Sequence, residues 1–335
     1  MGRLLERCWY RNGPLSLLLA PLSWLYRLLV FLRRALYAGG IRGIYTAPVP
    51  VIVVGNLTVG GTGKTPLVIW LAHFLRRHGY TPGIISRGYG GHARFYPQQV
   101  RADSDPLVVG DEAVLIARRT GCPMAVAPRR VKALKSLLAH HRCDVVISDD
   151  GLQHYALGRR VEVAVVDGVR RFGNRRCLPA GPLREPMRRL DRVDLVVGSG
   201  AAAAGEYLME YRQEPLRSLT GEGDKPLTRF SGQVVHAVAG VGNPQRFFAA
   251  LRDAGVEPVM HAFSDHHSYR PEELSFGDDV PLLMTEKDAV KCERFARPGW
   301  WYLPIVATLD EAFGERLLSL LPGPAAPAAE FPTKE

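Results

Sequence analysis

The sequence has few cysteines, and their spacing does not suggest any pairing. The five are Cys8, Cys122, Cys143, Cys177 and Cys292, an odd number with wide gaps and no C-x-x-C pair. This spacing argues against both a zinc site and a disulfide framework. It favours a reducing, cytosolic setting.

The sequence also lacks a long uncharged apolar run. The apolar run Gly13–Tyr26 stops at Arg27, and Arg33 and Arg34 follow. It is shorter than the roughly 20 residues that a helix needs to cross a bilayer. A transmembrane helix is therefore not the expected reading of the N-terminus.

Arginines edge this N-terminal segment. Arg3, Arg7 and Arg11 recur every four residues, so a helix would place them on one face. An apolar face edged with arginines is typical of a helix that lies in the interface of an anionic leaflet. Residues 1–40 are accordingly predicted to form a membrane-associated helix region. A secretory signal and a core helix pair remain as alternatives.

The sequence has fewer acidic than basic residues, and the resulting formal net charge of +10 favours an anionic partner. The basic residues are scattered, without an aromatic-rich basic tract or an RNA-binding signature, so nucleic acid is not the expected partner. A phosphorylated substrate or an anionic membrane face fits better. The length of 335 residues allows one large or two medium domains, and we expect a monomer.

The apolar runs alternate with helical patterns along most of the chain. "VPVIVVG" (Val49–Gly55) is continuous and β-branched, as a buried parallel strand should be, and "CDVVISDDG", "VEVAVVDG" and "VDLVVGSG" repeat the pattern. This alternation predicts an α/β fold with a parallel sheet flanked by helices. The tail 322–335 has too little apolar content to fold and is predicted to be disordered.

A glycine-rich loop follows the first of these strands and opens a helix. Glycines let backbone N–H groups curl around phosphate oxygens, and the helix N-terminus adds positive potential. Lys64 would reach the β- and γ-phosphates, and the Thr65 hydroxyl would bind Mg²⁺. Thr58 stands where the general G-x-x-x-x-G-K-[ST] pattern has its first glycine. The residues predicted to bind ATP are Thr58, Gly60, Gly61, Thr62, Gly63, Lys64 and Thr65.

Such a loop needs a carboxylate at the end of a neighbouring strand. "VVISDD" supplies Asp149 and Asp150 directly after an apolar run, and these would hold Mg²⁺ directly or through water. Helix capping or simple solvation of the two carboxylates is the alternative interpretation of this pair.

Several further clusters follow one another in a fixed order. They are "SRGYGG", "GDEA", "SDDGLQH", "DGVRRFGN", "LPAGPLRE", "FSDHH" and "TEKDAVK". Together with "GNLTVGGTGKTP" they resemble the tetraacyldisaccharide 4'-kinase family of lipid A biosynthesis, from the N-terminal helix to about residue 320. Thr58 is not a departure from that family, which usually carries Ser or Thr there.

The resemblance implies a fold and a reaction. The fold is P-loop NTPase-like, with two α/β/α lobes joined by a short β linker. The first lobe would span 41–160 and 270–321, the second 161–258, and the hinge 259–269 with FSDHH. The reaction is transfer of the ATP γ-phosphate to the 4'-hydroxyl of a tetraacyl disaccharide 1-phosphate, giving lipid IVA. The enzyme would work at the cytoplasmic face of a bacterial inner membrane.

The resemblance also implies roles for individual residues. Asp111 in GDEA resembles the catalytic aspartate, His266 in FSDHH its histidine partner, and Glu112 a Mg²⁺-associated glutamate. Lys64 joins them as a catalytic residue. A sugar hydroxyl is a poor nucleophile, so a base should accept its proton. Residues predicted to bind the substrate, with arginines gripping its phosphate, are Asn56, Arg130, Gln153, His154, Arg171, Asn174, Arg184 and Glu185.

The main alternative is a membrane-associated P-loop ATPase or GTPase switch. It leaves FSDHH without a purpose, and GTP use would call for an N-K-x-D-like base reader, which "TEKD" imitates only loosely. A membrane-bound nucleotide sensor without enzymatic activity is the second alternative.

Overall fold

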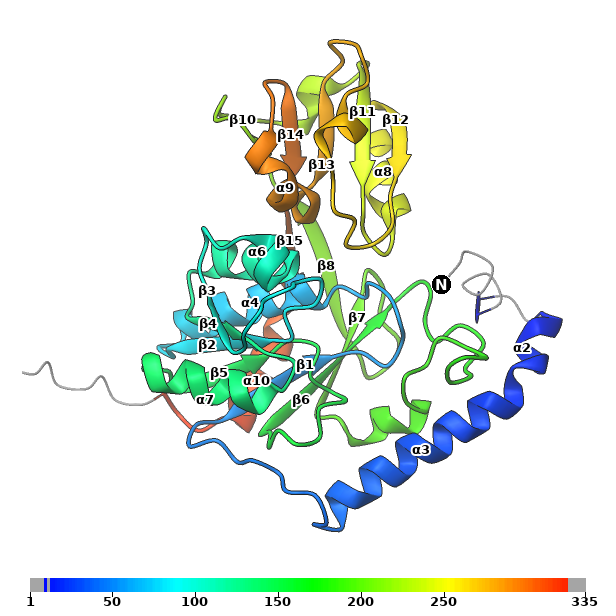
Figure 1. The fold of residues 1–335 in the computed structure, drawn as a ribbon, viewed down its shortest axis with the longest axis vertical. Helices are drawn as coiled ribbons and strands as arrows, with labels where there is room; N and C mark the ends of the chain where they lie inside the picture. Colours follow the sequence, from blue (N-terminus) through cyan, green and yellow to red (C-terminus); the bar gives the residue numbers. More distant parts are fainter. Residues whose placement is uncertain (1–8, 11–12, 325–335) are drawn as a thin grey trace, which may run out of the picture.

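The computed structural model describes residues 9–10 and 13–324, which form two lobes built around separate β-sheets (Figure 1). The predicted arginine face of Arg3, Arg7 and Arg11 and the part of the predicted disordered tail beyond 324 lie outside the described residues.

The first lobe contains a nine-stranded sheet in the order β15-β8-β7-β6-β1-β5-β2-β4-β3. Its interior strands run parallel, and β3 and β15 at the two edges pair antiparallel with their neighbours. The strands are β1 (Val51–Gly55), β2 (Pro82–Ser86), β3 (Gln98–Val100), β4 (Met124–Val126), β5 (Val145–Ser148), β6 (Val161–Asp167), β7 (Leu195–Ser199), β8 (Tyr207–Gln213) and β15 (Ile305–Leu309).

Helices cover both faces of this sheet, and its central strands β1, β2, β5 and β6 are buried at every position. Ile52 and Val54 of β1 belong to the core on the side of α4 (Lys64–Arg77), α6 (Asp111–Thr120) and α10 (Glu311–Leu320). Val51 and Val53 belong to the opposite core, which includes residues of α7 (Arg130–His140). The short helix α5 (Pro106–Val109) precedes α6.

The second lobe contains a six-stranded sheet in the order β10-β9-β14-β13-β11-β12. Phe248, Leu251 and Trp301 are buried in its core. Its elements are β9 (Leu216–Ser218), β10 (Asp224–Lys225), β11 (Val234–Ala239), α8 (Pro244–Asp253), β12 (Glu257–Ala262), β13 (Leu282–Thr285), α9 (Glu286–Cys292) and β14 (Trp300–Leu303). Its short 3-10 helices are η2 (Leu227–Phe230), η3 (Pro271–Leu274) and η4 (Glu293–Phe295), whereas η1 (Met187–Arg192) belongs to the first lobe, between β6 and β7.

The division between the lobes differs from the expected one. The strands β6 and β7, expected in the second lobe, pair with the first sheet, and β13 and β14, expected in the first lobe, belong to the second sheet. All of these runs carry the same apolar pattern, so strand pattern alone cannot assign them to a sheet. The chain passes between the sheets at 214–215 after β8 and at 304 before β15, and these two strands pair antiparallel. FSDHH follows β12 inside the second lobe and is not the hinge.

The N-terminal helices α2 (Pro14–Leu18) and α3 (Ala20–Ala38) lie along the first lobe, away from the second (Figure 1). Their polar residues Ser16 and Ser23 are buried, whereas one apolar surface of α3 faces out. This surface, called the outward face below, has side chains between 48% and 67% exposed: Leu22, Trp24, Leu25, Leu28, Leu29, Phe31 and Leu32.

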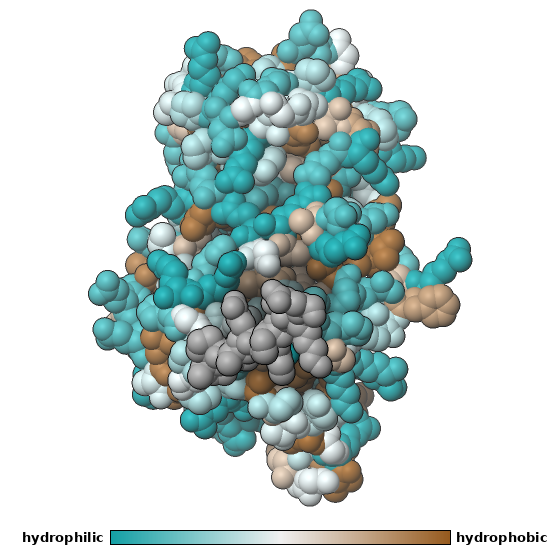
Figure 2. Space-filling model, turned by 90° about the vertical axis from the view of Figure 1, so that its left-hand side faces the viewer, coloured by the Kyte–Doolittle hydropathy of each residue, from teal (hydrophilic) through white to brown (hydrophobic). Residues whose placement is uncertain are grey.

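The outward face excludes the core-helix-pair interpretation, because a core helix buries its apolar side. Within the described part of the chain, no helix has the length and apolar character needed to cross a bilayer. On the face shown in Figure 2, by contrast, hydrophilic residues cover most of the upper lobe.

Candidate active site

The glycine-rich loop connects β1 to α4 at the carboxyl edge of the first sheet. Gly60 and Gly63 have φ angles of +109° and +93°, a region open to glycine at little cost. A Cβ at Gly63 would lie 2.1 Å from the Tyr211 hydroxyl oxygen, so the loop is also closely packed there. Thr58 is buried and pairs with Leu183, and Thr62 is buried one residue before Gly63.

Asp149 follows β5 directly and is almost fully buried. Ser86 Oγ donates to its Oδ2 at 3.1 Å, while Oδ1 is buried without a hydrogen-bond partner in the described chain. Burial, with the nearby charges of Glu112 and Asp150, raises the pKa of Asp149 to about 6. A carboxylate oxygen without a partner, crowded by other carboxylates, is the setting that a hard cation stabilises.

Asp150 is held in place by two cations. Lys64 Nζ lies 3.5 Å from its Oδ1, and Arg184 donates to both carboxylate oxygens at 3.1 and 3.2 Å. Burial opposes ionisation of Asp150, but Lys64 and Arg184 outweigh it and hold the pKa well below its usual range. Among the described residues, no group of three His, Cys, Asp or Glu side chains is arranged to hold a metal by itself.

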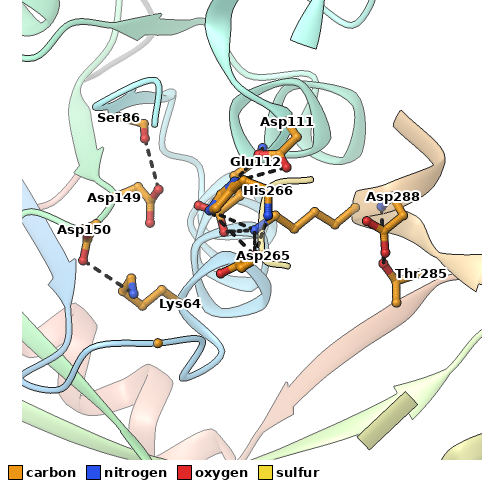
Figure 3. A network of polar contacts seen from close by, with 12 residues as sticks. Lys64, Ser86, Asp111, Glu112, Asp149, Asp150, Asp265, His266, Thr285 and Asp288 are labelled. Atoms are coloured by element: carbon orange, nitrogen blue, oxygen red, sulfur yellow. Dashed lines mark hydrogen bonds and ion pairs between the residues drawn. The ribbon is translucent and has the colours of Figure 1, made fainter. Parts of the chain in front are cut away.

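Asp111 and His266 come together across the two lobes (Figure 3). Asp111 is the first residue of α6, and His266 Nδ1 lies 2.9 Å from its Oδ1. Burial would raise the pKa of Asp111, but the His266 hydrogen bond and the charges of Lys287 and Lys291 lower it to about 2. Burial works against protonation of His266, but its bond to Asp111 raises the pKa of the imidazole above its usual value.

Lys287 connects the same cluster, and sequence reasoning did not single it out. Its Nζ donates to Glu112 Oε1 and to Asp265 Oδ1, both at 2.9 Å, and lies 3.3 Å from His266 Nε2. Burial disfavours its charge, but Glu112, Asp111 and Asp265 hold the Lys287 pKa above its usual range. The sequence feature that could have pointed to Lys287 is the motif TEKDAVK, which comes at the end of an apolar strand pattern.

Asp288 and Lys291 extend this support on the same helix, α9. Asp288 is fully buried and accepts from the Gly240 N–H at 2.9 Å, the Tyr269 hydroxyl at 3.0 Å and Thr285 Oγ1 at 2.6 Å. Lys291 Nζ lies 2.8 Å from Asp288 and 3.7 Å from Asp111. One helix of the second lobe therefore places two lysines beside the Asp111–His266 pair.

Arg130 is placed differently from a substrate ligand. Its side chain is almost fully buried, and its Nη2 donates to the backbone carbonyls of Asp149 and Asp150, both at 3.1 Å. The Arg130 backbone N–H donates to His154 Nε2 at 3.2 Å. A buried guanidinium committed to carbonyl oxygens fits support of the two aspartates better than substrate contact.

The other predicted substrate residues divide between two regions. Arg171 forms a bidentate pair with Glu206, at 2.7 and 2.6 Å. Gln153 Nε2 donates to the Asn56 carbonyl at 3.1 Å and to Glu185 Oε1 at 2.9 Å. Asn174 Nδ2 donates to Ser16 Oγ at 2.9 Å. The structure thus brings Asn56, Gln153, His154, Arg184 and Glu185 close to the aspartates, whereas Asn174 contacts the N-terminal helix α2 and Arg171 is engaged by Glu206.

A cavity of about 520 Å³ opens between the lobes beside the glycine-rich loop. Gly61–Pro66 line one side, and the opposite side carries Gly242, Arg246 and Phe247 from the second lobe. Tyr211 and Ile305 of the connecting strands also line it. This volume is in the range of small-molecule sites, and its apolar and glycine-rich walls suit a ligand with one flat and one anionic end.

Comparison with known proteins finds relatives over nearly the whole chain. A family model described as tetraacyldisaccharide-1-P 4'-kinase matches residues 15–322. A tetraacyldisaccharide 4'-kinase of Nitrosococcus oceani is 57% identical over 95% of this chain and 94% of its own length. One from Hahella chejuensis is 51% identical over 93% and 94%. A crystal structure of the "apo" form of LpxK from Aquifex aeolicus in complex with ATP superimposes with a TM-score of 0.77, at 27% identity, covering 92% of this chain and 100% of that one.

Proposed function

Because the chain belongs to the tetraacyldisaccharide 4'-kinase family, we propose that phosphoryl transfer takes place between its two lobes, with Asp111 as the base. The chain is an ATP-dependent kinase of lipid A biosynthesis, and it phosphorylates the 4'-hydroxyl of a tetraacyl disaccharide 1-phosphate. The observation that carries the proposal is the Asp111–His266 contact of 2.9 Å, made between lobes beside the cavity.

ATP would lie in the cavity, with its phosphates on the glycine-rich loop. The backbone N–H groups of Gly60–Thr65 and the N-terminus of α4 attract anions there. The Lys64 side chain is 13% exposed and lines the cavity from the first residue of α4. The fit of the ATP-bound relative supports this assignment.

Mg²⁺ fits the carboxylates at the end of β5. Asp149 has a buried oxygen without a hydrogen-bond partner in the described chain, and Thr65 lies at the mouth of α4. Mg²⁺ keeps several waters and takes few protein carboxylates, so it does not need a cage made of protein alone. Thr65 and Asp149 would hold it, with Glu112 and Asp150 nearby. When bound, it neutralises charge on the transferring phosphates.

Asp111 would accept the proton of the sugar hydroxyl as the new bond to phosphorus forms. Its low pKa keeps it ionised at neutral pH, and His266 Nδ1–H fixes the direction of the carboxylate. A weak base suffices because the transition state is loose and the nucleophile needs orientation most of all. The Lys287 ammonium group contacts Glu112, Asp265 and Nε2 of His266, and so holds these three side chains together beside Asp111.

The outward face of α3 would lie in the cytoplasmic leaflet of the inner membrane. Trp24 and Phe31 are 67% and 65% exposed, and Arg27, Arg33 and Arg34 are on the same helix. Apolar side chains flanked by arginines bind an anionic interface. A lipid substrate with its acyl chains in the bilayer would then be presented to the site directly.

The test is to incubate the protein with γ-labelled ATP, Mg²⁺ and the tetraacyl disaccharide 1-phosphate in detergent. Labelled lipid is expected, and Asp111→Asn and His266→Gln should each lower kcat by about 10²- to 10⁴-fold with little change in KM. Exposed Lys132 on α7 provides a matched control, Lys132→Met. Near-normal turnover in Asp111→Asn would remove Asp111 from the role of base. Free phosphate without labelled lipid would instead favour an ATPase switch.

A further inference from the structure

We propose that the N-terminal helices control the geometry of the nucleotide site through one short segment, residues 176–185. When the outward face of α3 binds a lipid surface, this segment is ordered and holds Asp150 and the glycine-rich loop in their binding positions. Ser16, Ser23 and Tyr26 act as positioning residues, because their hydroxyls bond to backbone carbonyls of this segment. The inference rests on the membrane contact in the proposed function and adds a coupling between that contact and nucleotide binding.

One side of the 176–185 segment is fastened to the N-terminal helices. Ser16 Oγ donates to the Ala180 carbonyl at 2.7 Å, and Ser23 Oγ donates to the Cys177 carbonyl at 2.8 Å. Tyr26 Oη donates to the Arg184 carbonyl at 3.0 Å. All three bonds join positions more than 150 residues apart in the sequence.

The other side of the segment is fastened to the nucleotide site. The Arg184 N–H donates to the Leu57 carbonyl at 2.6 Å, and the Val59 N–H donates to the Pro182 carbonyl at 2.8 Å. Leu183 forms a bridge with Thr58. The Arg184 side chain then reaches Asp150 at 3.1 Å. The Arg184 backbone carbonyl therefore accepts a hydrogen bond from Tyr26, while the Arg184 side chain binds the Asp150 carboxylate.

A second route runs through the loop that follows the aspartates. Arg33 of α3 lies over the Tyr155 ring, 5.5 Å from its centroid, and donates to the Gln153 carbonyl at 3.3 Å. Tyr155 Oη and Gln153 Nε2 both donate to Glu185, at 2.5 and 2.9 Å. Glu185 is the last residue of the 176–185 segment and is almost fully buried.

The N-terminal helices turn their polar side toward the protein and their apolar side outward, so a lipid surface would favour this attached orientation. Their serines face the protein and their large apolar side chains face out. In water this arrangement leaves apolar surface unburied, so the helices are held mainly by polar contacts that contribute about 1 kcal/mol each. A lipid surface would bury the outward face and select the attached orientation. Nucleotide binding and membrane binding then favour the same state, and each strengthens the other.

The test measures nucleotide affinity, so it does not depend on lipid phosphorylation. The full chain is titrated with a fluorescent ADP and Mg²⁺, in buffer and with vesicles of phosphatidylethanolamine and phosphatidylglycerol that lack any lipid A precursor. We expect the vesicles to tighten binding by about fivefold, within the usual range of allosteric coupling. Equal affinity with and without vesicles would overturn the inference.

Variants locate the coupling. Tyr26→Phe, and separately the double variant Ser16→Ala/Ser23→Ala, should reduce the vesicle effect to less than about twofold, because each removes bonds to the segment. Ser→Ala raises helix propensity, so lost helix structure would not explain the result. Tyr37→Phe is the matched control on α3, because the Tyr37 hydroxyl makes no hydrogen bond within the described part of the chain.

Two further readouts separate the outcomes. Flotation should show that Tyr26→Phe still binds the vesicles, because its outward face is intact; a wild-type vesicle effect in that variant would refute the proposed route. In the kinase assay Tyr26→Phe should lower kcat and leave the KM for lipid unchanged. If vesicles tighten nucleotide binding but no labelled lipid forms, the proposed function fails while the coupling stands.

Discussion

Replacing Lys287 with methionine tests how the second lobe holds the candidate site. Methionine keeps much of the side-chain length and removes the charge. Lys287 Nζ lies 2.9 Å from a carboxylate oxygen of Glu112 and 2.9 Å from one of Asp265. At an effective dielectric constant of about 20, each pair contributes roughly 6 kcal/mol before desolvation is counted.

Desolvation and solvent screening cancel most of this attraction. The Lys287 side chain is only 13% exposed, but Glu112 and Asp265 are 32% and 37% exposed and partly screened. The net loss in free energy of unfolding on Lys287→Met should therefore be about 2 kcal/mol, below the 3–5 kcal/mol typical of a fully buried pair. The variant also leaves two carboxylates unneutralised beside Asp111.

The assay has two parts. Urea denaturation of the wild type and Lys287→Met gives the change in free energy of unfolding, and the kinase assay gives kcat. We expect kcat to fall by at least about tenfold, since Glu112, Asp265 and His266 lose their common partner. Lys132→Met, on the exposed side of α7, should change neither quantity. If Lys287→Met had the same urea midpoint, the same dependence of unfolding free energy on urea concentration and the same kcat as the wild type, this account of Lys287 would be refuted.

Three further perturbations have defined outcomes. Gly63→Ala should weaken nucleotide binding and destabilise the fold by more than about 1 kcal/mol, because its φ is +93° and the new Cβ meets Tyr211; wild-type behaviour in both would contradict this. Burial and the charge of Arg130 lower the pKa of His154 in the folded protein to about 4. The neutral His154 side chain therefore contributes its full share of the unfolding free energy above pH 6.5, and this contribution is lost as the pH falls from 6.5 toward 4. Urea titrations should therefore show that His154→Asn loses less unfolding free energy between pH 7 and pH 5 than the wild type does. An equal loss in the two proteins would argue against this role of His154. EDTA should abolish turnover and excess Mg²⁺ restore it, with Asp149→Asn needing about tenfold more Mg²⁺; an unchanged requirement would exclude Asp149 as a ligand.

The fold class followed from the sequence because periodicity is a local property. The run Val49–Gly55 is apolar at every position, and β1 is buried on both faces of the sheet. Glycines before Lys64 likewise indicated a turn into a helix, and α4 begins at Lys64. These features depend on neighbouring residues and on the cost of exposing apolar side chains, both of which can be evaluated without a partner strand.

The assignment of strands to lobes could not be made in the same way. The runs at β6 and β13 have equivalent apolar patterns, yet β6 pairs with β1 and β13 with β11. Strand pairing is decided by which surfaces remain to be covered after the rest of the chain has packed. The expected boundary at 161 and the expected hinge at FSDHH both failed for this reason.

The sequence by itself determined the alternation of strands and helices, the glycine-rich loop and the chemical character of its acidic and basic clusters. Only the tertiary structure decided which charges meet. It places His266 2.9 Å from Asp111, 155 residues away, a pair that the sequence had implied only through the family resemblance. It also adds Lys287 from α9 and commits Arg130 to backbone carbonyls. The physical reason is that periodicity and turn chemistry act over a few residues, whereas ion pairs and buried hydrogen bonds depend on distances in space, which are fixed only when the two lobes pack.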